Sequence, residues 1–178
     1  MHQTTRSRQK FYVEIIKPSH YDDDGYVIQW MRAFIPSNSL ACLWALAEDV
    51  RQRKVLGEDV EIVLNGYDET HRIIPVQKII RRIKAAGGNG IVLMTGVQSN
   101  QFPRAADLAR EFRQAGIQVA IGGFHVSGCI SMLPELPADI QAVQDDGISL
   151  FAGEAEGRLE DLFKDAHTRA LKPVYNYL

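Results

Sequence analysis

The sequence alternates short apolar runs with longer amphipathic segments, and this alternation constrains the fold more than any other feature. The apolar runs predict strands at residues 11–16, 60–64, 90–94, 117–121 and 148–152. The segments between and after them predict helices at residues 40–54, 75–86, 103–115, 134–144 and 157–168. Strands and helices that alternate in this way build parallel βαβ units. The sequence therefore predicts an α/β domain with a five-stranded parallel sheet and helices on both faces.

Both ends of the chain differ from this regular middle part. Residues 1–10 are polar and basic and offer almost nothing to bury, which predicts a disordered N-terminal arm. Residues 171–178 carry aromatic side chains but no strand or helix pattern, so we interpret them as the start of a linker to a catalytic domain absent from this chain. The α/β domain is expected to span residues 11–170.

The composition excludes several classes of protein. With 20 basic and 22 acidic side chains the formal charge is −2, so the chain lacks the basic excess typical of nucleic-acid binders. No apolar run approaches the roughly 20 residues of a membrane span, and residues 1–10 lack the apolar core of a secretion signal. Two distant cysteines, Cys42 and Cys129, indicate no disulfide framework. We therefore expect a cytoplasmic protein.

The connections between the predicted elements differ in length according to their direction. Those from a helix to the next strand are short, whereas those from a strand to the next helix are longer and polar or rich in glycine. The longer connections are residues 17–39, 65–74, 95–102, 122–129 and 153–157. In an open parallel sheet they meet at the carboxyl ends of the strands, where such folds bind ligands. This asymmetry predicts a ligand site at that edge.

The usual nucleotide-binding signatures are missing from these loops. The chain has neither Gly-x-Gly-x-x-Gly after the first strand nor a Gly-x-x-x-x-Gly-Lys-Ser/Thr phosphate loop. The first loop instead carries Asp22, Asp23 and Asp24, whose carboxylates would repel a pyrophosphate. Glycines follow the fourth and fifth predicted strands, where they let a backbone approach a large, flat ligand without Cβ contact.

Two of these glycine-containing loops resemble a known family. Gly122-Gly123-Phe124-His125, followed about thirty residues later by Gly153-Glu154-Ala155-Glu156, resembles the N-terminal cobalamin-binding domain of radical S-adenosylmethionine enzymes. Residues 91–100 are also similar to a strand and loop of that family, and the resemblance covers most of residues 11–170. It implies a Rossmann-like, flavodoxin-like sheet of order 2-1-3-4-5 that holds cobalamin at its carboxyl edge. The residues implied for cofactor binding are Thr95, Gly96, Val97, Gln98, Ser99, Asn100, Gly122, Gly123, Phe124, His125, Val126, Gly153 and Glu154.

The sequence departs from related families in two places. It lacks the Asp-x-His-x-x-Gly motif whose histidine binds cobalt in methionine synthase-type domains, so no protein ligand to the metal is expected. Radical chemistry requires a Cys-x-x-x-Cys-x-x-Cys motif, which two distant cysteines cannot provide. The resemblance therefore implies a domain that is not catalytic alone and presents cobalt as a methyl carrier to a downstream barrel. The iron–sulfur cluster and S-adenosylmethionine would belong to that barrel.

Two other functions remain open at this stage. The chain can be a docking or lid module of the same family that has lost the cofactor, or a free-standing flavodoxin-like enzyme acting on a small molecule. Single residues are equally open: His125 either contacts the cofactor or hydrogen-bonds the neighbouring backbone. Glu154 and Glu156 either act as an acid and base pair or complement the start of a helix.

Overall fold

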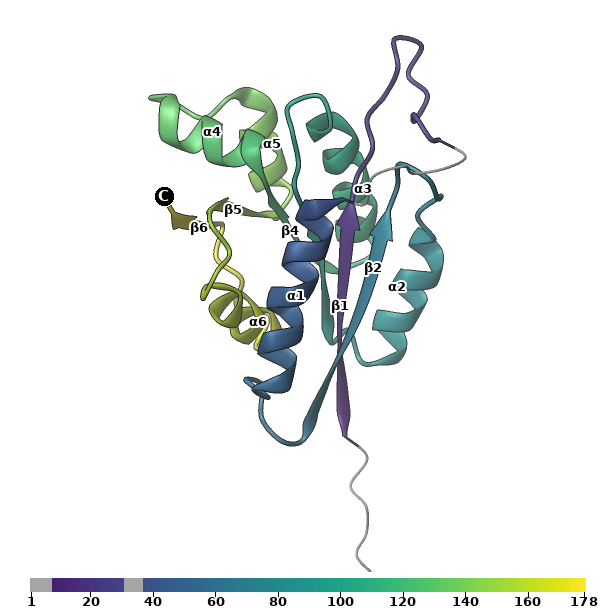
Figure 1. Cartoon of the computed structure of the whole chain (residues 1–178), viewed down its shortest axis with the longest axis vertical. Helices are drawn as coiled ribbons and strands as arrows, with labels where there is room; N and C mark the ends of the chain where they lie inside the picture. The colour runs from purple at the N-terminus through teal and green to yellow at the C-terminus, as the bar shows by residue number, and fades with distance from the viewer. Residues whose placement is uncertain (1–7, 31–36) are drawn as a thin grey trace, which may run out of the picture.

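A parallel sheet with helices on both faces forms the centre of the computed structural model, which describes residues 8–30 and 37–178 (Figure 1). The strands are β1 Gln9–Lys17, β2 Val60–Asp68, β3 Gly90–Met94, β4 Gln118–Gly122, β5 Ser149–Gly153 and β6 Val174–Tyr177. The helices are α1 Asn38–Gln52, α2 Val76–Ala85, α3 Phe102–Gln114, α4 Phe124–Met132, α5 Ala138–Asp145 and α6 Leu159–His167. No helix in this part of the chain is both long and apolar enough to cross a membrane. The fold is a Rossmann-like α/β arrangement.

The sheet has six strands in the order β2-β1-β3-β4-β5-β6, and all neighbouring pairs are parallel. The prediction of five strands in the order 2-1-3-4-5 is therefore incomplete, because β6 adds a sixth strand beside β5. This strand lies within residues 171–178, where no strand was expected. Its Tyr175 is 2% exposed, and the Tyr175 hydroxyl donates to Asp165 Oδ2 at 2.7 Å.

Two further boundaries differ from the sequence predictions. β1 begins at Gln9, because the backbone of Gln9 and Lys10 pairs with β2 although both side chains are exposed. The expected N-terminal arm is therefore shorter than residues 1–10, and its residues 1–7 lie outside the described residues. Residues 124–129, expected as part of a loop, belong to α4, which begins directly after Gly123. The helix predicted at residues 134–144 is α5, which begins four positions later, at Ala138.

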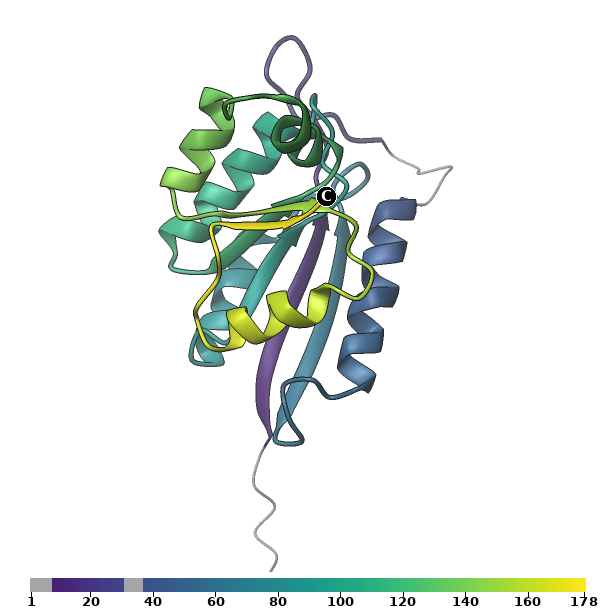
Figure 2. The same cartoon turned by 90° about the vertical axis from the view of Figure 1, so that its left-hand side faces the viewer.

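Side chains that alternate along each strand divide the core into two halves. On one face, residues such as Val92, Met94 and Ile121 pack under α2, α3, α4 and α5. On the other face, Ile91, Leu93 and Ala120 pack with residues of α1 and α6. Figure 2 shows these two helices beside the sheet. The first half is the larger apolar cluster, and the second half contains the candidate site.

Candidate functional site

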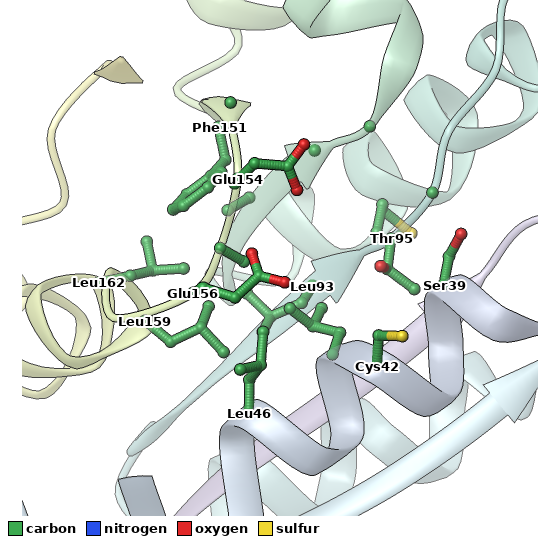
Figure 3. Close-up of a pocket in the computed structure, with 18 of the residues that line it drawn as sticks. Ser39, Cys42, Leu46, Leu93, Thr95, Phe151, Glu154, Glu156, Leu159 and Leu162 are labelled. Atoms are coloured by element: carbon green, nitrogen blue, oxygen red, sulfur yellow. The ribbon is translucent and has the colours of Figure 1, made fainter. Parts of the chain in front are cut away.

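A cavity of about 350 Å³ opens on the α1 and α6 side of the sheet, at the carboxyl ends of β3, β4 and β5 (Figure 3). Its lining comes from these strands, from the loops that follow them, and from the two helices. The lining residues are Asn38, Ser39, Cys42, Leu43, Leu46, Leu93, Met94, Thr95, Gly96, Ala120, Gly122, Gly123, Phe151, Gly153, Glu154, Ala155, Glu156, Leu159 and Leu162. The cavity lies at the edge where the loop asymmetry predicts a ligand.

Small residues on β4 explain why this place is hollow. Ala120 and Gly122 are the residues of β4 that line the cavity, and they lie between Leu93 of β3 and Phe151 of β5. Because Ala120 has a small side chain and Gly122 has none, a space remains between α1 and α6 above this part of the sheet, which forms the floor of the cavity. Leucines from both helices form its walls, so the inner part of the cavity is apolar.

The mouth of the cavity is polar and rich in hydrogen-bond acceptors. Thr95 directly follows β3, Ser39 lies on α1, and Glu154 and Glu156 lie on the loop after β5 (Figure 3). Thr95 is 7% exposed, yet its hydroxyl has no hydrogen-bond partner among the described residues. Glu154 and Glu156 are exposed and form no ion pair within the same part of the chain. These groups are free to contact a ligand.

Glycine occupies three positions near the mouth for different structural reasons. Gly123 has φ of 143°, and a Cβ atom there would collide with the backbone of Val97 and Gly96. Gly153 has φ of 95°, and its Cβ would collide with the backbone of Tyr177. These two positions require glycine for the packing of the chain itself. Gly122, in contrast, faces the cavity, and its Cβ would lie 3.3 Å from the Cβ of Phe151.

No family model matches this sequence, no curated protein is significantly similar to it, and no solved structure is significantly similar to its fold. The choice of ligand therefore depends on the geometry of the site.

The structure brings together only some of the residues expected to bind a cofactor. Those that line the cavity are Thr95, Gly96, Gly122, Gly123, Gly153 and Glu154. Those that do not are Val97, Gln98, Ser99, Asn100, Phe124, His125 and Val126. Val97 and Val126 are fully buried in the core on the opposite face. Phe124 is 77% exposed on α4, and residues 98–100 are exposed at the turn before α3.

His125 belongs to a small cluster away from the cavity. Its Nδ1 lies 3.1 Å from Ser99 Oγ, and its ring packs on Phe102 with 4.6 Å between centroids. Cys129, one helical turn along α4, places its Sγ 3.9 Å from His125 Nε2. Burial raises the pKa of the Cys129 thiol, which disfavours the thiolate needed for a nucleophile. The imidazole of His125 therefore contacts the side chains of Ser99 and Cys129 rather than the neighbouring backbone that the second alternative named.

The loops beside the mouth are held by partly buried polar contacts. Lys17, at the end of β1, donates from Nζ to Gln101 Oε1 at 2.7 Å and to the Gly96 carbonyl at 3.3 Å. Burial lowers the pKa of Lys17. Glu69, 1% exposed, accepts from Arg104 Nη2 at 2.6 Å. These contacts fix the loop after β3, which carries Gly96 to the cavity.

No metal site accompanies the cavity in the part of the chain that the structure describes, since no group of three or more His, Cys, Asp or Glu residues there is placed to hold an ion. The triple aspartate forms a turn: Asp22 Oδ1 accepts from the backbone N–H of Asp24 at 3.1 Å and of Tyr26 at 2.8 Å. Cys42 lines the cavity, whereas Cys129 lies in the core on the opposite face.

The sequence analysis did not identify the walls of the cavity. Cys42, Leu43 and Leu46 come from α1, and Leu159 and Leu162 come from α6. The sequence of α1 contains a partial signal for a wall of the cavity, because the helix has more apolar residues than its core packing uses. Only two of them, Ala47 and Val50, are buried. The excess apolar side chains on this helix face the cavity or solvent.

Proposed function

We propose that this domain binds cobalamin, with the nucleotide tail in the cavity and the corrin ring at the carboxyl edge of the sheet. The observation that carries the proposal is the apolar slot over Ala120 and Gly122, which opens at the edge where the paired glycine loops meet. Its volume of about 350 Å³ is at the lower end of the roughly 300–1,000 Å³ of ligand pockets. Such a volume suits a flat aromatic base rather than a macrocycle.

The residues present fit the tail of this cofactor. Leu93 and Phe151 would contact the two sides of a planar, uncharged base, and Gly122 would let the base lie against β4 without Cβ contact. Leucines of α1 and α6 would exclude water from it. The ring, which is too large for the slot, would lie outside against the loops that contain Gly96 and Gly153.

The cofactor supplies organometallic chemistry when bound, here as a carrier of a methyl group. This chain would hold and orient it, and we propose no protein ligand to cobalt and no catalytic residue. The partner in this proposal is a radical S-adenosylmethionine barrel with its own cluster, because Cys42 and Cys129 lie on opposite faces of the sheet. Both cysteines are free thiols, which suits the reducing cytoplasm that we propose as its location.

The test compares hydroxocobalamin with cobinamide, which lacks the nucleotide tail. We expect the purified domain to keep a corrin absorption band after desalting, and to bind cobinamide at least about tenfold more weakly in calorimetry, equivalent to about 1.4 kcal/mol. A colourless protein without heat of binding would contradict the proposal and favour a module without a cofactor. Equal binding of both corrinoids would contradict the placement of the tail.

A matched pair of variants tests the slot itself. Ala120→Leu fills the floor of the cavity and is expected to abolish cobalamin binding while the domain stays folded. Ala45→Leu makes the same change at an exposed position of α1 that does not line the cavity, and is expected to leave binding unchanged. Circular dichroism checks that both variants are folded.

A further inference from the structure

A serine, a histidine and an aspartate that are distant in sequence meet on the side of the sheet covered by α3, α4 and α5. Ser99 lies in the turn before α3, His125 in the first turn of α4, and Asp139 in the first turn of α5. His125 Nδ1 lies 3.1 Å from Ser99 Oγ, and His125 Nε2 lies 3.9 Å from Asp139 Oδ2. A hydroxyl and a carboxylate therefore approach the two nitrogens of one imidazole, as in sites that activate a serine for nucleophilic attack.

Packing holds this imidazole beside the serine. The ring of Phe102 lies against it with 4.6 Å between centroids, and Cys129 Sγ lies 3.9 Å from Nε2, so that the His125 side chain is only 16% exposed. The backbone N–H of His125 donates to the Val97 carbonyl at 3.0 Å. This bond ties the first turn of α4 to the connection that carries Ser99. Side-chain and backbone contacts therefore fix the base relative to the hydroxyl.

Two residues beside the ring are possible nucleophiles, and their surroundings differ. Cys129 is buried, and burial raises the pKa of its thiol. Ser99 is exposed, so a substrate can reach its Oγ from the solvent. When Nε2 of His125 carries the ring proton and faces Asp139, Nδ1 keeps the lone pair that accepts the hydroxyl proton of Ser99. The geometry therefore favours the serine over the cysteine.

The backbone around Ser99 provides hydrogen-bond donors for a negatively charged oxygen. Its turn leads directly into α3, because the Gln98 carbonyl accepts from the N–H groups of Gln101 and Phe102, both at 3.0 Å. The N–H groups of Ser99 and Asn100 have no acceptor within residues 8–30 and 37–178. Free amides of this kind at the start of a helix stabilise negative charge. The N–H of the residue after the nucleophile is also a common donor to the oxyanion in hydrolases.

We propose that Ser99 is the nucleophile of a hydrolytic site for small, uncharged carboxylic esters, with His125 as general base and Asp139 as a positioning residue. Ser99 Oγ bonds to the ester carbonyl carbon while its proton moves to His125 Nδ1 and the carbonyl electron pair moves onto the oxygen. Return of that pair breaks the bond to the leaving alcohol, which takes the proton from His125. Water then attacks the acyl-serine with the same base, and the acid leaves Ser99 as it was.

The position of Ser99 indicates the class of substrate. Ser99 does not line the cavity over β4, so that space is not available to an acyl chain bound to it. The side chain of Asp139 is 59% exposed beside the ring and would repel an anionic substrate. A neutral ester with a short acyl chain meets both conditions. Because the cluster is separate from the cavity, the inference does not depend on the proposed function.

Esterase activity and covalent labelling test the proposal on the whole chain without added cobalamin. The protein is incubated with p-nitrophenyl acetate and, separately, with a fluorophosphonate, whose point of attachment is located by peptide mass spectrometry. We expect repeated turnover of the ester and phosphonylation of Ser99. Ser99→Ala and His125→Gln are each expected to lower kcat/KM at least about 100-fold, the usual range for the loss of acid–base catalysis. Thermal unfolding checks that each variant is folded.

The positioning residue and a matched serine provide the controls. Asp139→Asn keeps a side-chain oxygen that can accept from the Ile140 N–H, so it tests the charge alone. It is expected to lower kcat about two- to fivefold at unchanged KM, the effect of one exposed charge contact, whereas Asp139→Glu is expected to stay within about twofold of the parent. Ser131, an exposed serine of α4 whose Oγ donates to the Gly128 carbonyl at 3.3 Å, should remain unlabelled, and Ser131→Ala should be fully active.

The contrary outcomes are equally definite. A parent protein that neither turns over the ester nor is labelled overturns the proposal, and so does labelling at a residue other than Ser99. Activity that persists in Ser99→Ala or in His125→Gln has the same meaning. An unchanged kcat in Asp139→Asn removes the role of the aspartate. The binding of cobalamin is measured separately, so none of these results decides the proposed function.

Discussion

The two faces of the sheet use the same strands for different purposes. On the face covered by α2, α3, α4 and α5, large side chains such as Phe112, Ile79 and Leu108 are fully or nearly fully buried in one continuous cluster. On the face covered by α1 and α6, small residues on β4 leave a cavity, and the leucines of α1 remain half-buried, although those of α6 are buried. Because alternate residues of a strand point to opposite faces, one face can be packed for stability while the other keeps a space for a ligand.

The largest expected effect comes from truncating the packed face. Phe112→Ala removes a ring that is 0% exposed and is expected to lower the free energy of unfolding by about 3–5 kcal/mol. Leu46→Ala, in the half-buried wall of the cavity, is expected to cost less than about 2 kcal/mol, because its side chain already borders an open space. Urea unfolding measures both. Equal losses would mean that the two faces do not differ in packing.

Adjacent glycines provide a sharper version of this comparison. Gly123→Val places a β-branched residue at a φ of 143° and against the backbone of Val97, so the free protein is expected to lose at least about 1–3 kcal/mol of stability. Gly122→Ala adds only a methyl group that faces the cavity, and is expected to weaken cobalamin binding more than stability. Thermal unfolding with and without cobalamin distinguishes the two. A Gly123→Val protein as stable as the parent would show that the turn does not require glycine.

The smallest expected effect concerns a buried carboxylate on the packed face. Glu14 of β1 is 0% exposed and accepts from Arg82 Nη1 at 3.0 Å and from Asn65 Nδ2 at 3.3 Å. Burial raises the pKa of Glu14 despite the attraction of Arg82. The folded state therefore holds this proton at pH values where the unfolded chain has released it, and stability falls as the pH rises from the unfolded value through the folded one.

Glu14→Gln removes this titration. Relative to the parent, the variant is expected to gain stability as the pH rises from 4.5, the ordinary pKa of glutamate, through the raised folded value. Urea unfolding at several pH values measures the difference. Glu111→Gln, an exposed change on the outer side of α3, serves as the control. A relative stability of Glu14→Gln that does not change with pH would contradict the raised pKa.

The alternation of strands and helices was predictable because each of the first five strands carries a run of apolar residues flanked by glycine or polar turns. β6 was missed because it is four residues long and pairs only with β5, so local sequence carries little of its signal. α4 was missed because Gly122 and Gly123 suggested a ligand loop, although the helix begins at the next residue. Long-range pairing with β5, rather than local propensity, decides β6.

The edge of the sheet at which the candidate site lies was predictable, but the residues that surround it were not. Loop lengths placed a ligand at the carboxyl ends of the strands, and the cavity lies there. Which residues of each loop face it is decided beyond the ends of the strands: Thr95 and Gly122 line the cavity, whereas Val97 and Val126, a few positions further along, enter the opposite core. The walls from α1 and α6 depend on where two helices separate, which no local pattern encodes.

The parallel direction of β6 has a practical consequence for labelling. Tyr177 pairs with Gly153, which lines the cavity, so the described chain ends at the same edge as the mouth. β1, in contrast, begins at the opposite edge, where the short connections lie (Figure 1). A fluorophore attached after Leu178 would therefore report on events at the mouth. An affinity tag on the N-terminal side would immobilise the domain with that edge facing the solution.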